Sequence, residues 1–405
     1  MARVMKDSGV EWIGQIPEEW HYSRVGNYFY FKSGDSLTSE EMPDDGKYIV
    51  YGANGIRGKY NKYNLDGKYI LLGRVGALCG NVHIVNGKKW ITEHALIAYK
   101  KGNIVEEFMG YVFASMDLKQ YSKASAQPVI SSDTISSLIF PLPCVDEQKR
   151  ISEFLDDKIG EVDTIVEKTK ASIDEYKKYR KAIVIKAVTK GLHPNVDMKQ
   201  TDSDWIGEIP AHWDYVRIQR LFETIDERNE DENALLLSLY TALGVKPRNE
   251  LEEKGNKAST VINYKKVQKN DVIVNKLLAW MGAIGYSDYE GVTSPDYDVY
   301  RARKGANVVR NYYNEYFRNT CFNGDCYKYG HGIMLMRWRT YPEEFLRIKV
   351  PNPPLAEQQE IADYLAEKCG EIDALIAKKE AFVEEMEAYK KSLIYEYVTG
   401  KKEVL

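Results

Sequence analysis

The chain has 405 residues, too many for one ordinary hydrophobic core, so its length predicts two or more domains. A formal net charge of −4 gives no overall indication of a nucleic-acid partner, so such evidence must be local. The composition argues against a membrane span and a disulfide framework, because no apolar run is long enough and the five cysteines are scattered. The start "MARVMKDSGV" lacks an apolar secretory segment, and the cytoplasm is the expected compartment.

A stretch near the N-terminus occurs twice in the chain. "EWIGQIPEEW" from Glu11 recurs as "DWIGEIPAHW" from Asp204, a shift of 193 positions, and the match extends over residues 5–29 and 198–222. Two tryptophans, a glycine and a proline kept in register indicate an internal duplication rather than chance. We name residues 5–29 the first anchor and residues 198–222 the second anchor.

Each anchor leads into a variable block, block one over residues 25–140 and block two over residues 218–350. Short alternating apolar runs broken by Gly, Asn and Asp predict a mixed α+β fold in both. "YILLGRVGALCGNV" from Tyr69 aligns with "DVIVNKLLAWMGAI" from Asp271, and "ITEHALIAYK" from Ile91 aligns with "VTSPDYDVYR" from Val292. We interpret this as one fold with a divergent surface, the alternative being a coincidental strand–turn similarity.

Both blocks are locally basic although the chain is acidic overall. Residues 46–101 hold ten Lys/Arg against two acidic residues, and residues 301–340 hold eight against two. Residues 254–280 hold six Lys against one Asp. Tyr, Trp, Asn and His are interleaved with these charges, a pattern typical of nucleic-acid binding, where cations neutralise phosphates and aromatics stack. The alternative is that these are ordinary solvated lysines on loops.

A second repeated stretch follows each block. "PLPCVDEQKRISEFLDDKIGEVD" from Pro141 corresponds to "PNPPLAEQQEIADYLAEKCGEID" from Pro351 with a shift of 210, so the second copy is 17 residues longer in between. Positions at alternating steps of four and three from Leu155 and from Leu365 are then mostly apolar. This spacing predicts two coiled-coil helices of about 42 residues, roughly 60–65 Å long, paired antiparallel. They should begin after the proline clusters and end at Gly191 and Gly400.

Catalytic motifs are missing from the sequence. No glycine-rich phosphate loop of the Walker type is present. "NPPL" from Asn352 has a leucine where the loop of adenine methyltransferases has an aromatic residue, and its position in the repeat indicates a helix start. Cys321, Cys326 and His331 lack a convincing fourth zinc ligand. We therefore expect a chain that binds rather than catalyses, with no metal of its own.

Taken together, the chain resembles the DNA-specificity subunit of type I restriction–modification systems. The resemblance rests on the "WIGxIPxxW" anchors, "YGANGIRG", "GRVG", "ITEHAL", "QPVISSDTISSLIFPLP", and the helix starts "EQ" and "EQQEIADYL". It implies an α+β fold with two mixed α/β target-recognition domains separated by two long antiparallel coiled-coil helices in a pseudo-two-fold repeat. The implied boundaries are 1–143 for target-recognition domain 1, 144–191 for the central helix, 192–353 for target-recognition domain 2 and 354–405 for the C-terminal helix.

The same resemblance implies the function. Each recognition domain would bind one half of an asymmetric bipartite site on double-stranded DNA, while the helices set the spacer and dock two modification (methyltransferase) subunits. Restriction/translocase subunits would complete the enzyme. The chain itself would be non-catalytic and bind no cofactor, since S-adenosylmethionine, ATP and Mg would belong to the partner subunits. Membrane association is not expected.

Candidate DNA contacts follow from the basic and aromatic stretches. Block one offers phosphate and groove contacts at Arg57, Lys59, Arg74, Lys88 and Lys89, and base contacts at Asn54, His94 and Gln127. Block two offers Lys246, Arg248, Lys276, Arg337 and Arg339, with polar or stacking contacts from Asn275, Trp280 and Trp338. The alternatives are a coiled-coil adaptor that presents two modules for other ligands and a self-contained nuclease or methyltransferase.

Overall fold

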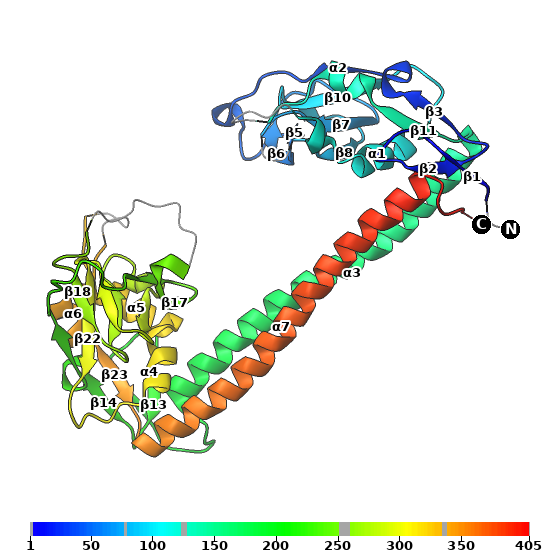
Figure 1. Cartoon of the computed structure of the whole chain (residues 1–405). Helices are drawn as coiled ribbons and strands as arrows, with labels where there is room; N and C mark the ends of the chain where they lie inside the picture. The colour runs from blue at the N-terminus through cyan, green and yellow to red at the C-terminus, as the bar shows by residue number, and fades with distance from the viewer. Residues whose placement is uncertain (1–2, 77–78, 123–127, 251–259, 334–337, 405) are drawn as a thin grey trace. The chain divides into compact units, whose positions relative to one another are not determined.

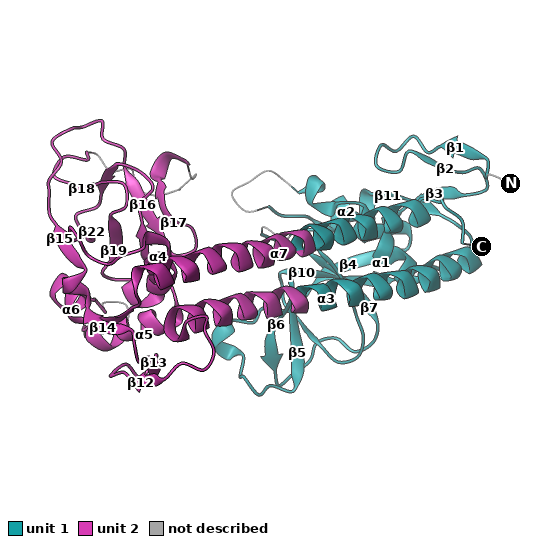
Figure 2. Ribbon diagram, turned by 90° about the horizontal axis from the view of Figure 1, so that it is seen from below, with its two compact units in different colours: residues 1–170, 380–405 teal, residues 171–379 magenta. Residues whose placement is uncertain are grey.

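The computed structural model describes residues 3–76, 79–122, 128–250, 260–333 and 338–404 (Figure 1). The chain divides into two compact units, unit 1 with residues 1–170 and 380–405 and unit 2 with residues 171–379 (Figure 2). Both units mix helices and strands, which confirms the predicted α+β class. Among the described residues, no helix combines the length and the apolar character that a membrane crossing requires.

Unit 1 is built on antiparallel sheets. The first anchor pairs β1 (Met5–Asp7) with β2 (Gln15–Pro17), and β3 (His21–Arg24) pairs with β11 (Ile139–Leu142). The main sheet has the order β4 (Phe29–Ser33), β10 (Ala95–Lys100), β7 (Tyr69–Gly73) and β8 (Val82–Val85). Beside it lie β6 (Gly55–Tyr60), β5 (Tyr48–Gly52) and β9 (Trp90–Ile91). The helices of this part are α1 (Glu106–Ser115) and α2 (Ser132–Ser137).

The main sheet of unit 1 is buried on both faces. Ile70 and Leu72 share a core with Phe113 of α1, whereas Leu71 belongs to a second core with Ile91 of β9. Successive side chains of a strand point to opposite faces, so "YILLG" is apolar throughout because both faces are covered.

Unit 2 repeats this order of elements. The second anchor pairs β12 (Met198–Gln200) with β13 (Glu208–Pro210), and β14 (Asp214–Arg217) pairs with β23 (Lys349–Asn352). The main sheet has the order β15 (Phe222–Ile225), β22 (Tyr297–Ala302), β19 (Val272–Asn275) and β20 (Ile284–Tyr286). Two further pairs are β16 (Leu237–Tyr240) with β17 (Gly244–Pro247) and β18 (Lys265–Val267) with β21 (Gly291–Thr293). The helices are α4 (Arg310–Phe317), α5 (Thr320–Tyr329) and α6 (Pro342–Arg347).

Short 3-10 helices complete both units. They are η1 (Val25–Asn27), η2 (Ser39–Glu41), η3 (Leu118–Tyr121), η4 (Ile218–Arg220), η5 (Arg248–Glu250) and η6 (Ala279–Met281). The core of unit 2 is rich in aromatic residues, because Tyr312, Tyr313 and Tyr316 of α4 are buried beside Phe222 of the sheet.

The two main sheets share their register over the first aligned stretch. Leu72 lies opposite Val82 in unit 1, and Val274 lies opposite Ile284 in unit 2, as the alignment of "YILLGRVGALCGNV" with "DVIVNKLLAWMGAI" requires. This pairing confirms that alignment.

The second aligned stretch was placed one residue too early. Leu96 lies opposite Leu72, and Asp298, not Tyr297, lies opposite Val274, so Leu96 corresponds to Asp298. The loop after Thr293 holds one additional residue, which the alignment passed over. A slip of one residue exchanges the two faces of a strand, so the correction decides which side chains face the core.

The two long helices begin and end where the sequence predicts. Helix α3 (Val145–Lys190) has 46 residues and α7 (Leu355–Val398) has 44, and each follows a proline-containing strand end. Gly191 and Gly400 come just after them with φ of 74° and 70°. This left-handed conformation favours glycine and ends the helix, as expected.

Helices α3 and α7 run antiparallel within each unit. In unit 1, Phe154 near the start of α3 contacts Tyr397 near the end of α7 with ring centroids 4.5 Å apart. Lys390 Nζ and Asp163 Oδ1 lie 2.6 Å apart. In unit 2 the corresponding cross-helix ion pair joins Arg180 Nε to Asp373 Oδ1 at 2.9 Å. Buried residues at the predicted positions are Ile159, Val162, Val166, Ile173 and Ala187 in α3, and Cys369, Ile372, Ile376 and Leu393 in α7.

Each anchor packs on the end of the long helix from the other repeat. A Cβ built on Gly400 would lie 2.5 Å from Pro17 Cδ, and one on Gly191 would lie 3.1 Å from Trp213 Cζ2. A side chain at Gly400 would overlap Pro17, and one at Gly191 would be in tight contact with Trp213. The first anchor therefore lies at the end of α7 and the second at the end of α3.

The repeated Glu-Gln pair joins the start of each helix to the rest of its unit. Glu147 Oε2 accepts a hydrogen bond from Trp20 Nε1 of the first anchor at 2.8 Å, and Glu357 Oε2 lies 2.9 Å from His212 Nε2 of the second. The next residue in each case, Gln148 or Gln358, is 1% and 0% exposed. Their Oε1 atoms accept the backbone N–H at the start of α1 (Val105) and of α4 (Val309).

Candidate nucleic-acid interface

Four predicted DNA contacts in unit 1 come together at one end of the main sheet. Arg74 follows β7, its backbone N–H donates to the carbonyl of His94 at 2.9 Å, and its Nη1 donates to Ser33 Oγ at 2.6 Å. The β5–β6 turn brings Asn54 to the same end, where its Oδ1 accepts from Asn81 Nδ2 at 2.9 Å. We name this set, with Arg57, the sheet-end group.

Arg57 reaches the sheet-end group across a glycine. A Cβ on Gly52 would lie 2.5 Å from Arg57 Cδ and 3.5 Å from Thr92 Oγ1, so Arg57 and Thr92 both lie against this glycine. Two cations, an amide and an imidazole at one sheet end offer donors and acceptors suited to phosphates and base edges.

Asn81 and His83 belong to this end of the sheet but were not predicted from the sequence. His83 is half-buried, its ring lies 6.1 Å from that of Tyr51, and its buried Nε2 has no hydrogen-bond partner among the described residues. Burial lowers the pKa of His83, so the ring is neutral near pH 7. The alternation of polar and apolar residues in "NVHIV" could have indicated them, because it places the side chains of Asn81 and His83 on the same face of a strand.

Lys59, Lys88 and Lys89 lie at the opposite end of strand β5. Lys88 Nζ stands 4.7 Å from the ring centroid of Tyr63, whose ring contacts Tyr48 at 5.1 Å. Lys59 is exposed on β6, and Lys89 Nζ donates to the carbonyl of Asn86 at 2.9 Å. These lysines suit phosphate contacts that carry no sequence information.

In unit 2 the predicted residues around the end of β19 also come together. Asn275 is buried, and its Oδ1 accepts from the N–H of Leu277 at 3.1 Å. Lys276 follows and accepts, through its carbonyl, the N–H of Thr340 at 2.9 Å. Arg339 adjoins Thr340 and pairs through its backbone with His331 at 2.9 and 3.0 Å.

Two predicted tryptophans form an aromatic row with Tyr327. The Tyr327 ring stacks on Trp338 at 4.9 Å and meets Trp280 edge-on at 6.0 Å. Both indole N–H groups donate to backbone carbonyls, Trp280 to Leu277 and Trp338 to Tyr327, each at 3.1 Å. Because the indole donors are already engaged, contact to a base would come from the ring faces and edges.

The remaining predicted residues lie elsewhere. Lys246 and Arg248 are on or next to the β16–β17 hairpin, with Lys246 Nζ 5.9 Å from the Tyr289 ring, and do not join the group around β19. Gln127 and Arg337 lie outside the described residues.

The two sheet ends differ in their charge. Lys276 corresponds to Arg74, but its Nζ lies 4.0 Å from Asp298 Oδ1, and the same oxygen accepts from Lys265 Nζ at 2.9 Å. Asp298 and Lys265 are both buried, and Leu96 stands at the position of Asp298 in unit 1. A shared scaffold therefore carries unlike chemistry at equivalent positions.

Comparisons with known proteins agree with this architecture. Residues 17–175 match the type I restriction modification DNA specificity domain. This part of the chain therefore resembles the DNA specificity domain of type I restriction–modification systems. The EcoprrI specificity subunit of Escherichia coli is 35% identical over 136 residues, which cover 33% of this chain and 34% of that relative. The match to this relative thus spans about a third of its length.

Two wider matches cover nearly the whole chain. The putative MjaX specificity subunit of Methanocaldococcus jannaschii is 24% identical over 423 residues, covering 96% of this chain and 95% of that relative. A solved chain described under complex assembly and conformational transition of the type I R-M system has a TM-score of 0.68 at 14% identity and covers 96% and 99% of the two chains. The structural likeness shows a shared fold.

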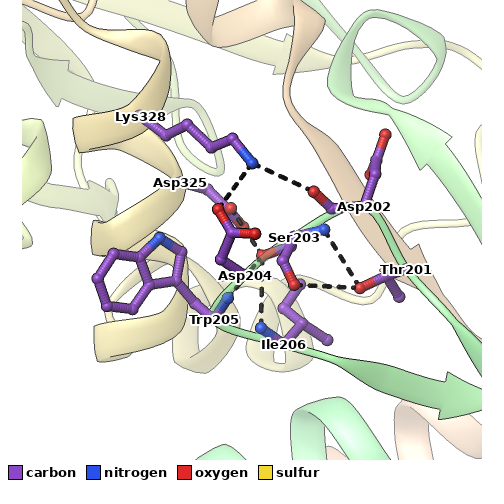
Figure 3. A network of polar contacts seen from close by, with 8 residues as sticks. All are labelled: Thr201, Asp202, Ser203, Asp204, Trp205, Ile206, Asp325 and Lys328. Atoms are coloured by element: carbon purple, nitrogen blue, oxygen red, sulfur yellow. Dashed lines mark hydrogen bonds and ion pairs between the residues drawn. The ribbon is translucent and has the colours of Figure 1, made fainter.

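Unit 2 also holds a buried carboxylate outside the DNA-contact candidates. Asp325 of α5 is 2% exposed, and its Oδ1 accepts from Ser203 Oγ of the second anchor at 2.7 Å (Figure 3). Lys328 Nζ donates to Asp204 Oδ2 at 2.9 Å. Burial raises the pKa of Asp325 to about 6, and the Ser203 bond and Lys328 oppose the rise.

The structure offers no metal site in the part of the chain that it describes. No group of three or more His, Cys, Asp and Glu in the described ranges is arranged to hold a metal ion. Cys321 and Cys326 are buried in α5, where Cys321 Sγ donates to the carbonyl of Trp205 at 3.3 Å.

Proposed function

We propose that this chain is the sequence-specific DNA-binding subunit of a type I restriction–modification enzyme, with each unit binding one half of an asymmetric bipartite site. The observation that carries the proposal is the shared strand order and register of the two main sheets, which bear unlike side chains at equivalent positions. Two similar scaffolds can present their ends to both DNA strands in inverted orientation, and unlike side chains select unlike half-sites.

The long helices have a second role in the proposal. The antiparallel contacts of α3 and α7 in both units support a coiled coil built on a pseudo-two-fold repeat. In this arrangement the helices set the spacer between half-sites and dock two methyltransferase subunits, to which restriction/translocase subunits are added. The proposed divisions are 1–143, 144–191, 192–353 and 354–405.

The chain is proposed to be non-catalytic. S-adenosylmethionine, ATP and Mg belong to the partner subunits in this proposal, and the part of this chain that the structure describes supplies donors, acceptors and aromatic faces for double-stranded DNA. The competing function is an adaptor that presents two modules for other ligands. It would use the same coiled coil, but it would not require two groups of cations and amides at the sheet ends.

Methylation mapping tests the proposal directly. A host that carries this chain with its methyltransferase partner should show one interrupted, asymmetric adenine-methylated motif. The purified chain alone, given DNA, Mg²⁺ and S-adenosylmethionine, should yield no product. Salt-independent or absent DNA binding by the assembled complex would support the adaptor, because binding through phosphates weakens steeply with salt.

Arg74→Ala is expected to weaken binding by about 1–3 kcal/mol if the guanidinium contacts guanine, and to relax selectivity in one half-site only. The reason is that Arg74 lies in the sheet-end group of unit 1, while unit 2 keeps its own contacts. Lys101→Ala is the control, since it removes an exposed cation just beyond the other end of β10. Titration against a panel of half-site variants measures both effects, and equal loss from both variants would remove Arg74 from the interface.

A further inference from the structure

Unit 2 contains a cavity that the proposed base contacts do not use. Its volume is about 340 Å³, and it lies between the unit 2 halves of α3 and α7, the β16–β17 turn and the junction of α4 with α5. Its polar and charged lining is Arg180, Lys181, Thr241, Glu315, Arg318, Asn319, Thr320 and Asp373.

Arg318 brings a partly buried positive charge to this cavity. Its Nη2 donates to the carbonyls of Thr241 and Ala242 at 3.0 and 2.8 Å, but no carboxylate among the described residues forms an ion pair with it. Arg180, by contrast, is paired with Asp373. Burial lowers the pKa of Arg318, because the cation is held away from water, and the nearby Glu315 carboxylate opposes the shift only in part.

The first turn of α5 faces the same space. Asn319 caps this ten-residue helix, its Oδ1 accepting from the N–H of Phe322 at 3.0 Å. Asn319 is 6% exposed, and its buried Nδ2 has no hydrogen-bond partner within the described part of the chain. The first N–H groups of a helix carry partial positive charge and lack partners inside the helix, so they attract anions.

The net charge of the cavity lining indicates whether a singly or a doubly charged phosphate fits better. Three cations, Arg180, Lys181 and Arg318, face two carboxylates, Glu315 and Asp373, which leaves a net charge of +1. A phosphodiester carries one negative charge, whereas a free phosphate monoester carries close to two at neutral pH. The balance therefore favours a singly charged phosphodiester.

We propose that this cavity binds one backbone phosphate of DNA, held by Arg318, the Asn319 amide and the first N–H groups of α5. The inference rests on the proposed function for the source of the phosphodiester, and it adds a contact to the backbone rather than to a base. Phosphate contacts fix the position of a protein on the duplex without selecting sequence.

Asn319→Asp tests the site with little structural change. Aspartate keeps the oxygen that caps α5 and is equally favoured at that position, but it puts a negative charge where the amide would donate. Asn233→Asp is the matched control, because Asn233 is exposed before β16 and does not line the cavity. Lys181→Ala is a second variant, which removes an exposed cation of the lining without touching the cap.

The measurement is the dependence of DNA affinity on salt for the chain assembled with its methyltransferase subunits. Asn319→Asp should flatten the slope of log K against log salt by about 0.9, the value of one phosphate contact, with half-site preference unchanged. Asn233→Asp should leave the slope as it is. An unchanged slope for Asn319→Asp and Lys181→Ala in a complex that binds its DNA would overturn the cavity site and leave the proposed function standing.

A second arm distinguishes the sources of phosphate. The melting temperature of the full chain is measured in sodium phosphate and in sodium chloride at equal ionic strength. Phosphate should raise it by nearly the same small amount in the parent chain and in Asn319→Asp. If phosphate stabilises the parent chain but not Asn319→Asp, and the assembled complex binds no DNA, the cavity takes free phosphate and both the DNA source and the proposed function are wrong.

Discussion

Replacing Gln358 with leucine is expected to lower the free energy of unfolding of unit 2 by roughly 2–5 kcal/mol. The Gln358 side chain donates to the carbonyls of Pro353 and Asn307 at 2.8 and 3.1 Å and accepts the N–H of Val309 at 2.8 Å. Leucine has a similar volume but leaves these buried groups without partners, and an unpaired buried group costs about 1–3 kcal/mol. The loss should also loosen the start of α4 from the start of α7.

Gln359→Leu is the control for this prediction, since it makes the same change one residue later. Gln359 is exposed, and within the described part of the chain its amide donates to Asp363 of α7 alone, so its loss should cost about 0.5 kcal/mol or less. Urea denaturation followed by tryptophan fluorescence measures both variants. Equal midpoints for Gln358→Leu and Gln359→Leu would show that the buried glutamine does not hold the recognition block to the helix.

Asp325→Asn is expected to stabilise unit 2 by roughly 1–3 kcal/mol above pH 6. Because burial raises the pKa of Asp325 to about 6 from its ordinary value of 3.8, the folded state holds the proton more tightly than the unfolded chain. The stabilisation by the protonated form is fully present below about pH 4, is lost as pH rises to about 6, and stays lost above it. Asparagine is neutral throughout and still accepts from Ser203 (Figure 3).

The pH dependence separates this effect from a general gain in packing. The difference in unfolding free energy between Asp325→Asn and the parent should be small near pH 4, grow up to pH 6 and then remain constant. Asp204→Asn, an exposed partner of Lys328, is the matched control and should give a small difference without that rise. A constant difference from pH 4 to 8 would mean that Asp325 ionises normally in the folded chain.

Much of the architecture could be predicted from the sequence, because the same succession of segments occurs twice in the chain. A repeat of 193 and then 210 positions locates both anchors, both blocks and both helices, and apolar spacing with terminal glycines gives the ends of α3 and α7. These features depend on neighbours in the sequence, namely periodicity, proline geometry and the left-handed glycine, so local physics is sufficient to predict them.

The sites depended on contacts between distant segments. Arg74, Asn54 and His94 meet at a sheet end because of strand pairing, whereas Lys246 and Arg248, equally basic in the sequence, lie at a separate hairpin. Basic composition marks a region of the chain without revealing which of its charges share a face.

The sequence also did not reveal which cations are paired with carboxylates in the folded chain. Lys276 corresponds to Arg74 in the alignment, yet its ammonium group lies beside the buried ion pair of Lys265 and Asp298. The alignment did not reveal that Asp298 replaces Leu96, because one extra loop residue shifts this part of unit 2. The chain alone thus specifies a duplicated framework through short-range periodicity. Which side chains are free to meet DNA follows from burial and long-range pairing, because only packing brings a charge to its partner or leaves it without one.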